Sequence, residues 1–227
     1  MTSLDKYKNI SLLINYKPGH IYDDRNWSWI KKRYQTLMPN SEICIGNCAN
    51  NNYSKSLSIN EGANKATGDL FIIADPNIAI NMTCIDLGLK LLKKYPFVIP
   101  FSNFINISKH DSYKLHNLSP NLNLYESLFT AYKKESSPLG SLFMIPRVYF
   151  EKIGGFDENI TEWYEEDTDF INRLCGNFGS YGRVSNCSVW NLFHEKIQYP
   201  LYQNGINVEI IHKEKDSFTN MHWDIRI

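Results

Sequence analysis

The sequence of 227 residues lacks a net charge and lacks a long apolar run. It carries 24 basic and 24 acidic side chains, so no overall positive field draws it to nucleic acid. The composition does not exclude a local basic patch. No apolar stretch reaches about 18 residues, the length that a membrane-spanning helix needs, and residues 1–8 lack the apolar core of a signal peptide. We therefore expect a soluble, cytoplasmic protein that does not bind nucleic acid.

Two common kinds of site are also missing. Of the five cysteines, Cys44 and Cys48 are the nearest in sequence, and they have no second pair or histidines nearby, so no zinc site is indicated. Free buried thiols are then expected, which suits a reducing compartment. No G-x-G-x-x-G motif follows a predicted strand, which disfavours a dinucleotide-dependent dehydrogenase.

The chain alternates strand and helix patterns without an internal repeat or a low-complexity linker. With 43% hydrophobic residues it can fill the core of one large α/β domain. We expect strands at residues 10–14, 42–45, 70–74, 97–100, 139–145 and 189–193, and helices at residues 27–37, 52–66, 84–95, 147–153 and 166–174. Residues 102–123 lack clear periodicity, so we expect a long loop there, of the length that usually signals function.

The most informative stretch joins a glycine turn to adjacent acids. Residues 154–158 read Gly-Gly-Phe-Asp-Glu, and Glu166 and Asp167 lie soon afterwards at the start of an amphipathic helix. Acids at this place could take a proton from a substrate. The alternative is a solvated helix start, because the helix dipole favours acids in the first turn and Asp169 can pair with Arg173.

A second signal is Asp75, which follows the apolar residues 70–74. That short run predicts a strand buried on both faces in a mainly parallel sheet. Ligands bind outside the carboxyl ends of the strands in open α/β sheets, so Asp75 is well placed to meet a substrate or a metal. The alternative is a simple turn, since Asp-Pro-Asn is favourable turn chemistry by itself.

These features, in this order, resemble the metal-dependent glycosyltransferases of the GT-A fold, specifically family 2 and the galactosyltransferase-like carboxyl-terminal segment shared with chondroitin-type polymerases. The resemblance rests on residues 60–63 (Asn-Glu-Gly-Ala), 75–77 (Asp-Pro-Asn), 154–158 and 166–167, and covers roughly residues 9–194. It implies an α/β fold with a Rossmann-like, mixed but mainly parallel central sheet flanked by helices. We expect one GT-A domain over residues 1–195, with a C-terminal extension, residues 196–227, packed on it.

The same resemblance implies a reaction. It is the inverting, metal-assisted transfer of a sugar, hexosyl or N-acetylhexosaminyl, from a nucleotide sugar to a hydroxyl of an acceptor such as a glycan. Uridine diphosphate is the expected leaving group. Mn²⁺ or Mg²⁺ bridging the diphosphate would stabilise the charge that develops as the glycosidic bond breaks.

The expected metal ligands are Asp75, Asn77 and His194. The resembling enzymes hold the cation with an Asp-x-Asp motif at the positions of Asp75 and Asn77. Because an asparagine brings no charge, we expect weaker metal binding or contact through water. Several relatives carry a metal-binding histidine near the position of His194; the alternative is a hydrogen-bonded structural histidine.

The resemblance also assigns roles to the acid pair. In the inverting relatives the second acid deprotonates the acceptor hydroxyl and the first binds acceptor hydroxyls, so Asp167 is the expected base and Glu166 the acceptor ligand. Relatives often have a glycine between the tryptophan and the pair, where this chain has Tyr164 and Glu165, and these larger side chains would reshape the acceptor pocket. The identity of the acceptor therefore cannot be carried over.

Nucleotide contacts are expected from Asn15, Tyr16, Asn47 and Lys55, at the ends of the first two strands and in the polar segment that follows. Tyr16 could stack on a base, and Lys55 could meet phosphate or ribose. The alternative for each is an ordinary loop residue. Gly140 either lets donor or acceptor approach the backbone or allows close helix packing.

Two other functions compete with this one. A catalytically silent binding module that keeps the fold is supported by the neutral Asn77 and opposed by the intact Glu166-Asp167 pair. A nucleotidyltransferase usually opens with a glycine-rich, arginine-bearing loop after its first strand, and residues 15–19 do not supply one.

Overall fold

The computed structural model describes residues 6–46, 54–136, 139–160 and 165–195. All of these belong to one compact unit, Met1–Glu195. The predictions for Asn47, Tyr164 and the C-terminal extension at residues 196–227 lie outside the described residues. Within the described ranges, no helix is both long and apolar enough to cross a membrane.

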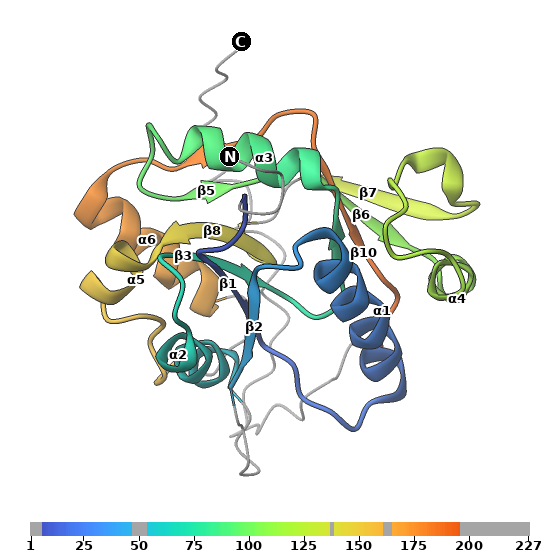
Figure 1. The fold of residues 1–227 in the computed structure, drawn as a ribbon, viewed down its shortest axis with the longest axis horizontal. Helices are drawn as coiled ribbons and strands as arrows, with labels where there is room; N and C mark the ends of the chain where they lie inside the picture. Colours follow the sequence, from blue (N-terminus) through green and yellow to red (C-terminus); the bar gives the residue numbers. More distant parts are fainter. Residues whose placement is uncertain (1–5, 47–53, 137–138, 161–164, 196–227) are drawn as a thin grey trace, which may run out of the picture. The chain divides into compact units, whose positions relative to one another are not determined.

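The elements alternate along the chain as expected (Figure 1). The strands are β1 (Ile10–Ile14), β2 (Glu42–Ile45), β3 (Leu70–Ala74), β4 (Ile78–Ile80), β5 (Val98–Ile99), β6 (Asn103–Ile107), β7 (Tyr132–Ser136), β8 (Leu142–Pro146), β9 (Gly182–Arg183) and β10 (Ser188–Asn191). The helices are α1 (Ile21–Leu37), α2 (Lys55–Lys65), α3 (Met82–Leu91), α4 (Lys109–His116), α5 (Arg147–Lys152) and α6 (Glu165–Phe178), with a 3₁₀ turn η1 (Glu126–Leu128).

The larger sheet has six strands in the order β2-β1-β3-β8-β5-β9. β1 runs parallel to β2 and β3, β5 runs parallel to β9, and β8 runs antiparallel to its neighbours β3 and β5. Every strand described in this sheet except β8 therefore points the same way, which confirms the predicted mixed, mainly parallel sheet. Leu12 and Ile72, in the adjacent β1 and β3, are fully buried, as expected of strands covered on both faces.

Helices flank this sheet (Figure 1). α2 packs on β1 and β2, α3 on β5 and β9, and α5 on β8. α6 is held by Phe170, whose ring lies 6.1 Å from that of Phe143 in β8 and stacks on Phe156 with a centroid distance of 4.0 Å. The predicted apolar face of α6 is thus buried, and its acidic first turn is placed near the carboxyl end of β3.

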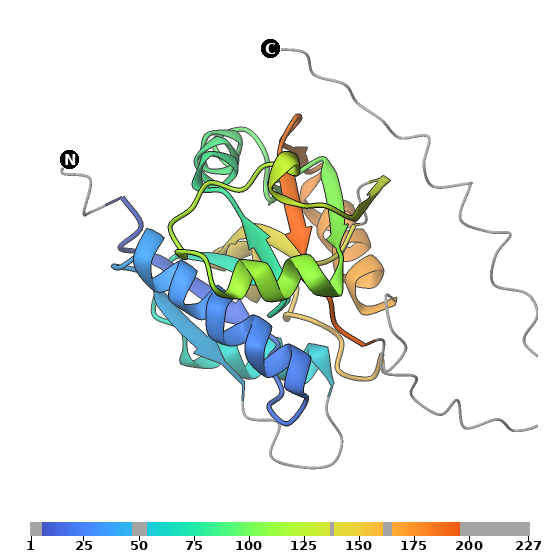
Figure 2. The ribbon, with the colours of Figure 1, turned by 90° about the vertical axis from the view of Figure 1, so that its right-hand side faces the viewer.

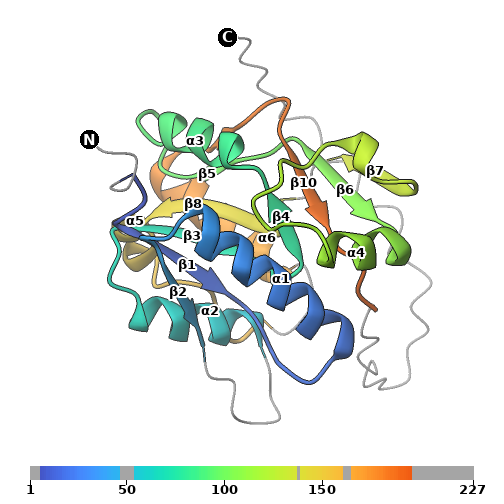
Figure 3. The same cartoon turned by 45° about the vertical axis from the view of Figure 1, so that its right-hand side comes forward.

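The predicted loop at residues 102–123 is wrong, because this segment contains β6 and α4. β6 belongs to a second sheet of four strands in the order β4-β10-β6-β7, and α4 lies beside α1 (Figures 2 and 3). The helix is short and its periodicity is weak, so tertiary contacts decide its formation. Asp111 shows this, since its carboxylate accepts backbone hydrogen bonds from Thr130 and Ala131.

Several boundaries also differ from the predicted ones. α1 begins at Ile21, before the residues with the clearest apolar spacing, and β8 begins at Leu142. Gly140 and Ser141 therefore lie ahead of β8 rather than inside it. β4 was not expected at all, because its three residues follow the Asp-Pro-Asn turn too closely to show a pattern of their own.

Arg33 fastens α1 to two other parts of this unit. It is 2% exposed, and its guanidinium donates to the carbonyls of Ile80, Pro120 and Leu122 and to the side chain of Asn81. Burial lowers its pKa to about 10. The buried charge is therefore satisfied mainly by backbone carbonyls at the end of β4 and in the segment after α4.

Replacing this residue should cost stability. In Arg33→Met the carbonyls lose their donor, and each buried carbonyl left unpaired costs about 1–3 kcal/mol. We expect urea denaturation to show a fall of at least about 2 kcal/mol in the free energy of unfolding. The exposed neighbour Lys32 supplies the control, since Lys32→Met should change stability by no more than about 0.5 kcal/mol. Equal stability of the two variants would contradict the role of Arg33 in holding α1 to β4 and to the segment after α4.

Candidate active site

Four charged side chains meet at the carboxyl end of β3. Lys55 is the first residue of α2, Asp75 follows β3, and Glu166 and Asp167 lie in the first turn of α6. The Nζ atom of Lys55 lies 2.7 Å from Asp167 Oδ2, 3.4 Å from Asp75 Oδ1 and 3.6 Å from Glu166 Oε1. The fold thus gathers residues from three segments into one group, which we call the acid cluster.

The acid cluster is largely closed to solvent. The Lys55 side chain is 10% exposed, that of Asp167 is 6% exposed, and that of Asp75, the most open, is 20% exposed. Burial by itself lowers the pKa of Lys55, but the charges of Asp167, Asp75 and Glu166 outweigh it and raise that pKa above its ordinary value. Lys55 is therefore a permanent ammonium ion.

For Asp167, burial affects the pKa more than the nearby ammonium of Lys55 does. Burial raises its pKa to about 6, helped by the charges of Asp75 and Glu166 and opposed by Lys55. This places the carboxylate closer to neutrality than an ordinary aspartate, which is the property of a group that accepts a proton near physiological pH.

Two oxygens of the acid pair have no hydrogen-bond partner among the described residues. They are Glu166 Oε2 and Asp167 Oδ1, and both are buried. Buried polar atoms are almost always paired in folded proteins, so orphan oxygens call for an explanation. Because the other oxygen of each carboxylate contacts Lys55, the free ones remain for a ligand.

Gly140 makes room for Asp167. A Cβ atom at this position would overlap the Asp167 carboxylate, so any side chain would displace it. The next residue, Ser141, adopts φ +76°, and its carbonyl accepts a hydrogen bond from the Asp75 backbone at 3.0 Å. Positive φ at a non-glycine residue is a local strain that the surrounding structure must hold. In this structure Gly140 therefore leaves the space that the Asp167 carboxylate occupies.

The Gly-Gly-Phe turn is held from α2. Asn60 accepts a hydrogen bond from Phe156 N and donates one to Phe156 O, each at 2.9 Å. Gly155, with φ +72°, lies against the Asn60 side chain where a Cβ atom would not fit. Asn60, the first residue of the predicted Asn-Glu-Gly-Ala motif, thus holds the turn that leads to α6 in place.

Arg173 holds the same turn from α6. Its Nε atom donates to Asp169 at 2.6 Å, which confirms the predicted pair, and its Nη1 atom donates to the carbonyls of Ile153 and Gly155. Arg173 therefore has two roles. It forms an ion pair with Asp169, and it donates hydrogen bonds to two backbone carbonyls of the glycine turn.

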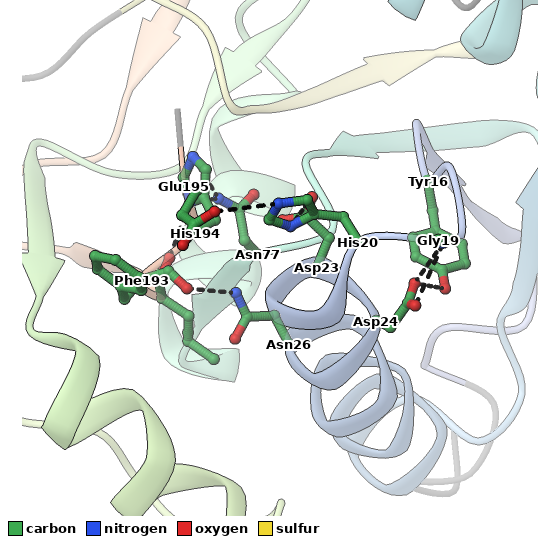
Figure 4. A network of polar contacts seen from close by, with 11 residues as sticks. Tyr16, Gly19, His20, Asp23, Asp24, Asn26, Asn77, Phe193, His194 and Glu195 are labelled. Atoms are coloured by element: carbon green, nitrogen blue, oxygen red, sulfur yellow. Dashed lines mark hydrogen bonds and ion pairs between the residues drawn. The ribbon is translucent and has the colours of Figure 1, made fainter. Parts of the chain in front are cut away.

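The predicted metal ligands fall into two groups. Asn77 Nδ2 lies 2.6 Å from His194 Nδ1 (Figure 4). The same nitrogen donates to Asn191 Oδ1 at 2.7 Å. The carboxylate of Asp75 instead contacts Lys55. Within the described part of the chain, no three His, Cys, Asp or Glu side chains are arranged to hold a metal ion by themselves. The assignment of Asp75, Asn77 and His194 as metal ligands stays a prediction.

The predicted nucleotide-binding residues that the structure describes lie in three different surroundings. Asn15 is buried directly after β1, and Lys55 belongs to the acid cluster. Tyr16 donates to Asp24 Oδ1 at 2.6 Å, and burial together with Asp24 raises its pKa. Asp24 also accepts from Gly19 N, so it orders the loop between β1 and α1 (Figure 4). Sequence analysis missed Asp24, although an acid in the first turns of a helix was its visible signal.

The segment after β10 is tied to the start of α1. Asn26 Nδ2 donates to the carbonyl of Phe193 at 3.0 Å, and His20 lies between Asp23 and Glu195, at 3.4 and 3.6 Å (Figure 4). These contacts bring the segment that carries His194 close to the loop between β1 and α1. The contacts to Phe193 and Glu195 do not show in the sequence, because their partners lie about 170 positions earlier in the chain.

Two surface hollows lie away from the acid cluster. One, of about 490 Å³, lies between α1 and α4 and is lined by residues that include Arg25, Trp29 and His116. The other, of about 450 Å³, is lined by residues that include Lys31 and Ile43. Neither includes a member of the acid cluster, so the candidate site is identified by its charges and orphan oxygens and not by these hollows.

Comparisons with known proteins concern the family and the fold of the chain. A protein-family model described as "Glycosyltransferase like family 2" matches residues 32–201. No curated protein matches the sequence significantly. The structure is similar to glucosyl-3-phosphoglycerate synthase from Mycobacterium tuberculosis, solved with Mn²⁺, UDP-glucose and phosphoglyceric acid, at 9% identity and a TM-score of 0.51, over 86% of this chain and 75% of that one.

Two structures of Drosophila β1,4-galactosyltransferase 7 are also similar. One, solved with manganese, UDP-galactose and xylobiose, is 16% identical with a TM-score of 0.45; the other, solved with xylobiose, is 14% identical with a TM-score of 0.43. Each match covers 78% of this chain but only 65% of the galactosyltransferase chain. At these identities the likeness concerns the fold alone.

The predicted family and fold are therefore confirmed, whereas the likeness to chondroitin-type polymerases stays a prediction. The central sheet is mixed and mainly parallel, and acids gather at the carboxyl end of β3. Since the family match spans well over half of the chain, the protein belongs to the glycosyltransferase like family 2 and has the GT-A fold.

Proposed function

We propose that this chain is an inverting, metal-assisted glycosyltransferase that moves a sugar from a UDP-sugar to a hydroxyl of an acceptor, such as a glycan. The observation that carries the proposal is the buried Asp167, which has one oxygen against Lys55 and the other without a partner in the described structure. Family membership supports the class of reaction. The ligands of the Mycobacterium tuberculosis neighbour indicate which donor and cation to test first.

Asp167 is the proposed base. The acceptor hydroxyl gives its proton to Asp167 Oδ1 while its oxygen attacks the anomeric carbon of the donor. The bond from that carbon to the diphosphate breaks on the opposite face, so the configuration inverts and the nucleoside diphosphate leaves with the bonding electrons. Glu166 Oε2, the other orphan oxygen, accepts a hydrogen bond from the acceptor and orients it.

The residues present fit a cation that arrives together with the diphosphate. Hard divalent cations are commonly bound through one or two carboxylates plus substrate phosphates rather than by a cage made of protein alone. Asp75, 20% exposed at the carboxyl end of β3, supplies such a carboxylate. Asn77, two residues further along the chain, and His194, which contacts Asn77, are the other two predicted ligands. Bound there, Mn²⁺ or Mg²⁺ supplies positive charge to the departing diphosphate.

The silent binding module remains the second candidate. It is favoured by the neutral Asn77 and by the ion pair that Asp75 already makes with Lys55. The space that Gly140 leaves for Asp167 favours catalysis, because a protein that only binds has no need of a buried, proton-accepting carboxylate. The hexosyl or N-acetylhexosaminyl nature of the sugar, the acceptor and a cytoplasmic location stay predictions.

The first test concerns the cation. Asp75→Ala should abolish most of the gain in uridine diphosphate affinity that manganese gives in wild-type protein, because the variant lacks the proposed carboxylate ligand. Titration calorimetry with and without manganese measures this gain. Asp69→Ala, an exposed acid at the other end of β3, serves as the control and should keep it. Full manganese dependence in Asp75→Ala would remove Asp75 from the metal site.

The second test concerns the base. Asp167→Asn is nearly isosteric, and loss of a general base lowers turnover by about two to four orders of magnitude. Donor affinity should survive, since the base contacts the acceptor. Asn172→Ala, at an exposed position later on the same helix α6, is the control and should keep its turnover. Wild-type turnover in Asp167→Asn would show that this acid is structural and would leave the binding module as the better candidate.

The pH dependence follows from the same residue. Because the pKa of Asp167 is raised to about 6, the carboxylate is ionised above that value and protonated below it. Only the ionised form accepts a proton, so kcat/KM should fall about tenfold for each pH unit below about pH 6. A profile measured with saturating cation shows this limb. A constant rate through that range would mean that a group other than Asp167 takes the proton.

A further inference from the structure

Lys55 occupies an unusual place for a lysine. It is the first residue of α2, an eleven-residue helix with no acid in its first turn. The amino end of a helix carries a partial positive charge, so an ammonium group there is unfavourable for the helix. Ser54 already caps the helix by accepting from Leu57 N at 3.4 Å. Helix stability therefore does not explain why Lys55 stands there, whereas its three carboxylate neighbours do.

The charges of the acid cluster do not balance. Asp75, Glu166 and Asp167 carry three negative charges when ionised, against one positive charge on Lys55. The cluster therefore attracts cations, and any cation that approaches Asp75 meets an ammonium already in contact with that carboxylate. Buried carboxylates without compensating charge are costly, so Lys55 is the counter-ion that keeps the unliganded cluster tolerable.

A divalent cation on Asp75 would lie close to that ammonium. The contact from Lys55 Nζ to Asp75 Oδ1 is 3.4 Å. A metal–oxygen bond of about 2.1 Å at the same oxygen would place the metal no more than about 5.5 Å from Nζ. Two cations at that separation, inside a site with little water, repel each other strongly. Both cannot hold the Asp75 carboxylate without a cost.

We propose that Lys55 is a displaceable counter-ion, whose ammonium group competes with the divalent cation for the Asp75 carboxylate. The inference rests on the proposed function and deepens it. The cation alone binds weakly, because it must work against the ammonium. The diphosphate relieves this competition, since it brings its own negative charge, to which the flexible lysine side chain can turn. Cation and nucleotide thus bind cooperatively, and each raises the affinity of the other by the same factor.

The test is a titration with manganese and no nucleotide. Free Mn²⁺ is followed by electron paramagnetic resonance in wild-type protein, Lys55→Met, Lys55→Arg and Lys65→Met. We expect Lys55→Met to bind manganese at least about tenfold more tightly than wild type. Lys55→Arg keeps the charge and should stay weak. Lys65→Met removes an exposed lysine from the same helix and should match wild type.

A second series adds uridine diphosphate. The nucleotide should tighten manganese binding in wild type by more than it does in Lys55→Met, because the variant has no ammonium to displace. If Lys55→Met does not fold, the double variant Lys55→Met with Glu166→Gln, which removes one charge of each sign, gives the same comparison. Manganese affinity that is equal to or weaker than that of wild type, in the variant that folds, overturns the proposal.

Failure of this inference is distinguishable from failure of the proposed function. The first titration contains no nucleotide, so it measures competition at the carboxylate whether or not the protein transfers sugar. Wild-type protein that binds no UDP-sugar with any divalent cation would reject the proposed function by itself. Donor binding and turnover in wild type, with unchanged manganese affinity in Lys55→Met, would reject only the role of Lys55.

Discussion

The ion pairs between Lys55 and its three carboxylates are the constraint on which the rest of the site depends. A buried ammonium and buried carboxylates are tolerated only when they meet at short range. The start of α2, the end of β3 and the start of α6 must therefore come together at one place, although Lys55 and Asp167 are separated by 112 positions in sequence. The hydrogen bonds of Asn60 and Arg173 hold the turn before α6, and so help to keep these three segments together.

Departures from ordinary local preferences gather around the same point. A lysine stands at the amino end of a helix, Ser141 adopts a positive φ, and two buried carboxylate oxygens lack partners among the described residues. Each of these lowers stability, and none improves packing. Strain and unpaired groups that collect in one place are typical of sites kept for ligands, since the surrounding core supplies the stability that they give up. Here that core is the buried β1, β3 and β8 with the aromatic cluster beneath α6.

The second sheet gives the site a neutral rim. Asn77, Asn191 and Asn106 form a chain of side-chain amides across β4, β10 and β6, with hydrogen bonds of 2.7 and 2.6 Å. His194 joins this chain, and α1 holds the segment that carries it (Figure 4). Amides offer oxygens to a ligand without adding charge. Asn77 is only two residues from Asp75 in the chain, so this row of amides begins next to a member of the acid cluster.

The sequence by itself determined the parts of the fold that short-range patterns report. Mostly apolar runs identified β1 and β3, because strands buried on both faces are apolar almost throughout. Asp75 at a strand end and the acids at the start of α6 were visible for a similar reason, since their meaning depends only on the element that they follow or begin. Order and spacing of these motifs were enough to indicate the family that the comparisons confirmed.

Only the tertiary structure decided what those residues contact. The sequence presented Lys55 as a phosphate ligand and Gly140 as a point of close approach, and it did not show that both adjoin Asp167. It also hid β6 and α4, which are short and depend on distant partners such as Thr130 and Asn191. The physical reason is the same in each case. Periodicity records which face of an element is buried, whereas the pairing of charges and the formation of short elements depend on where the chain returns in space.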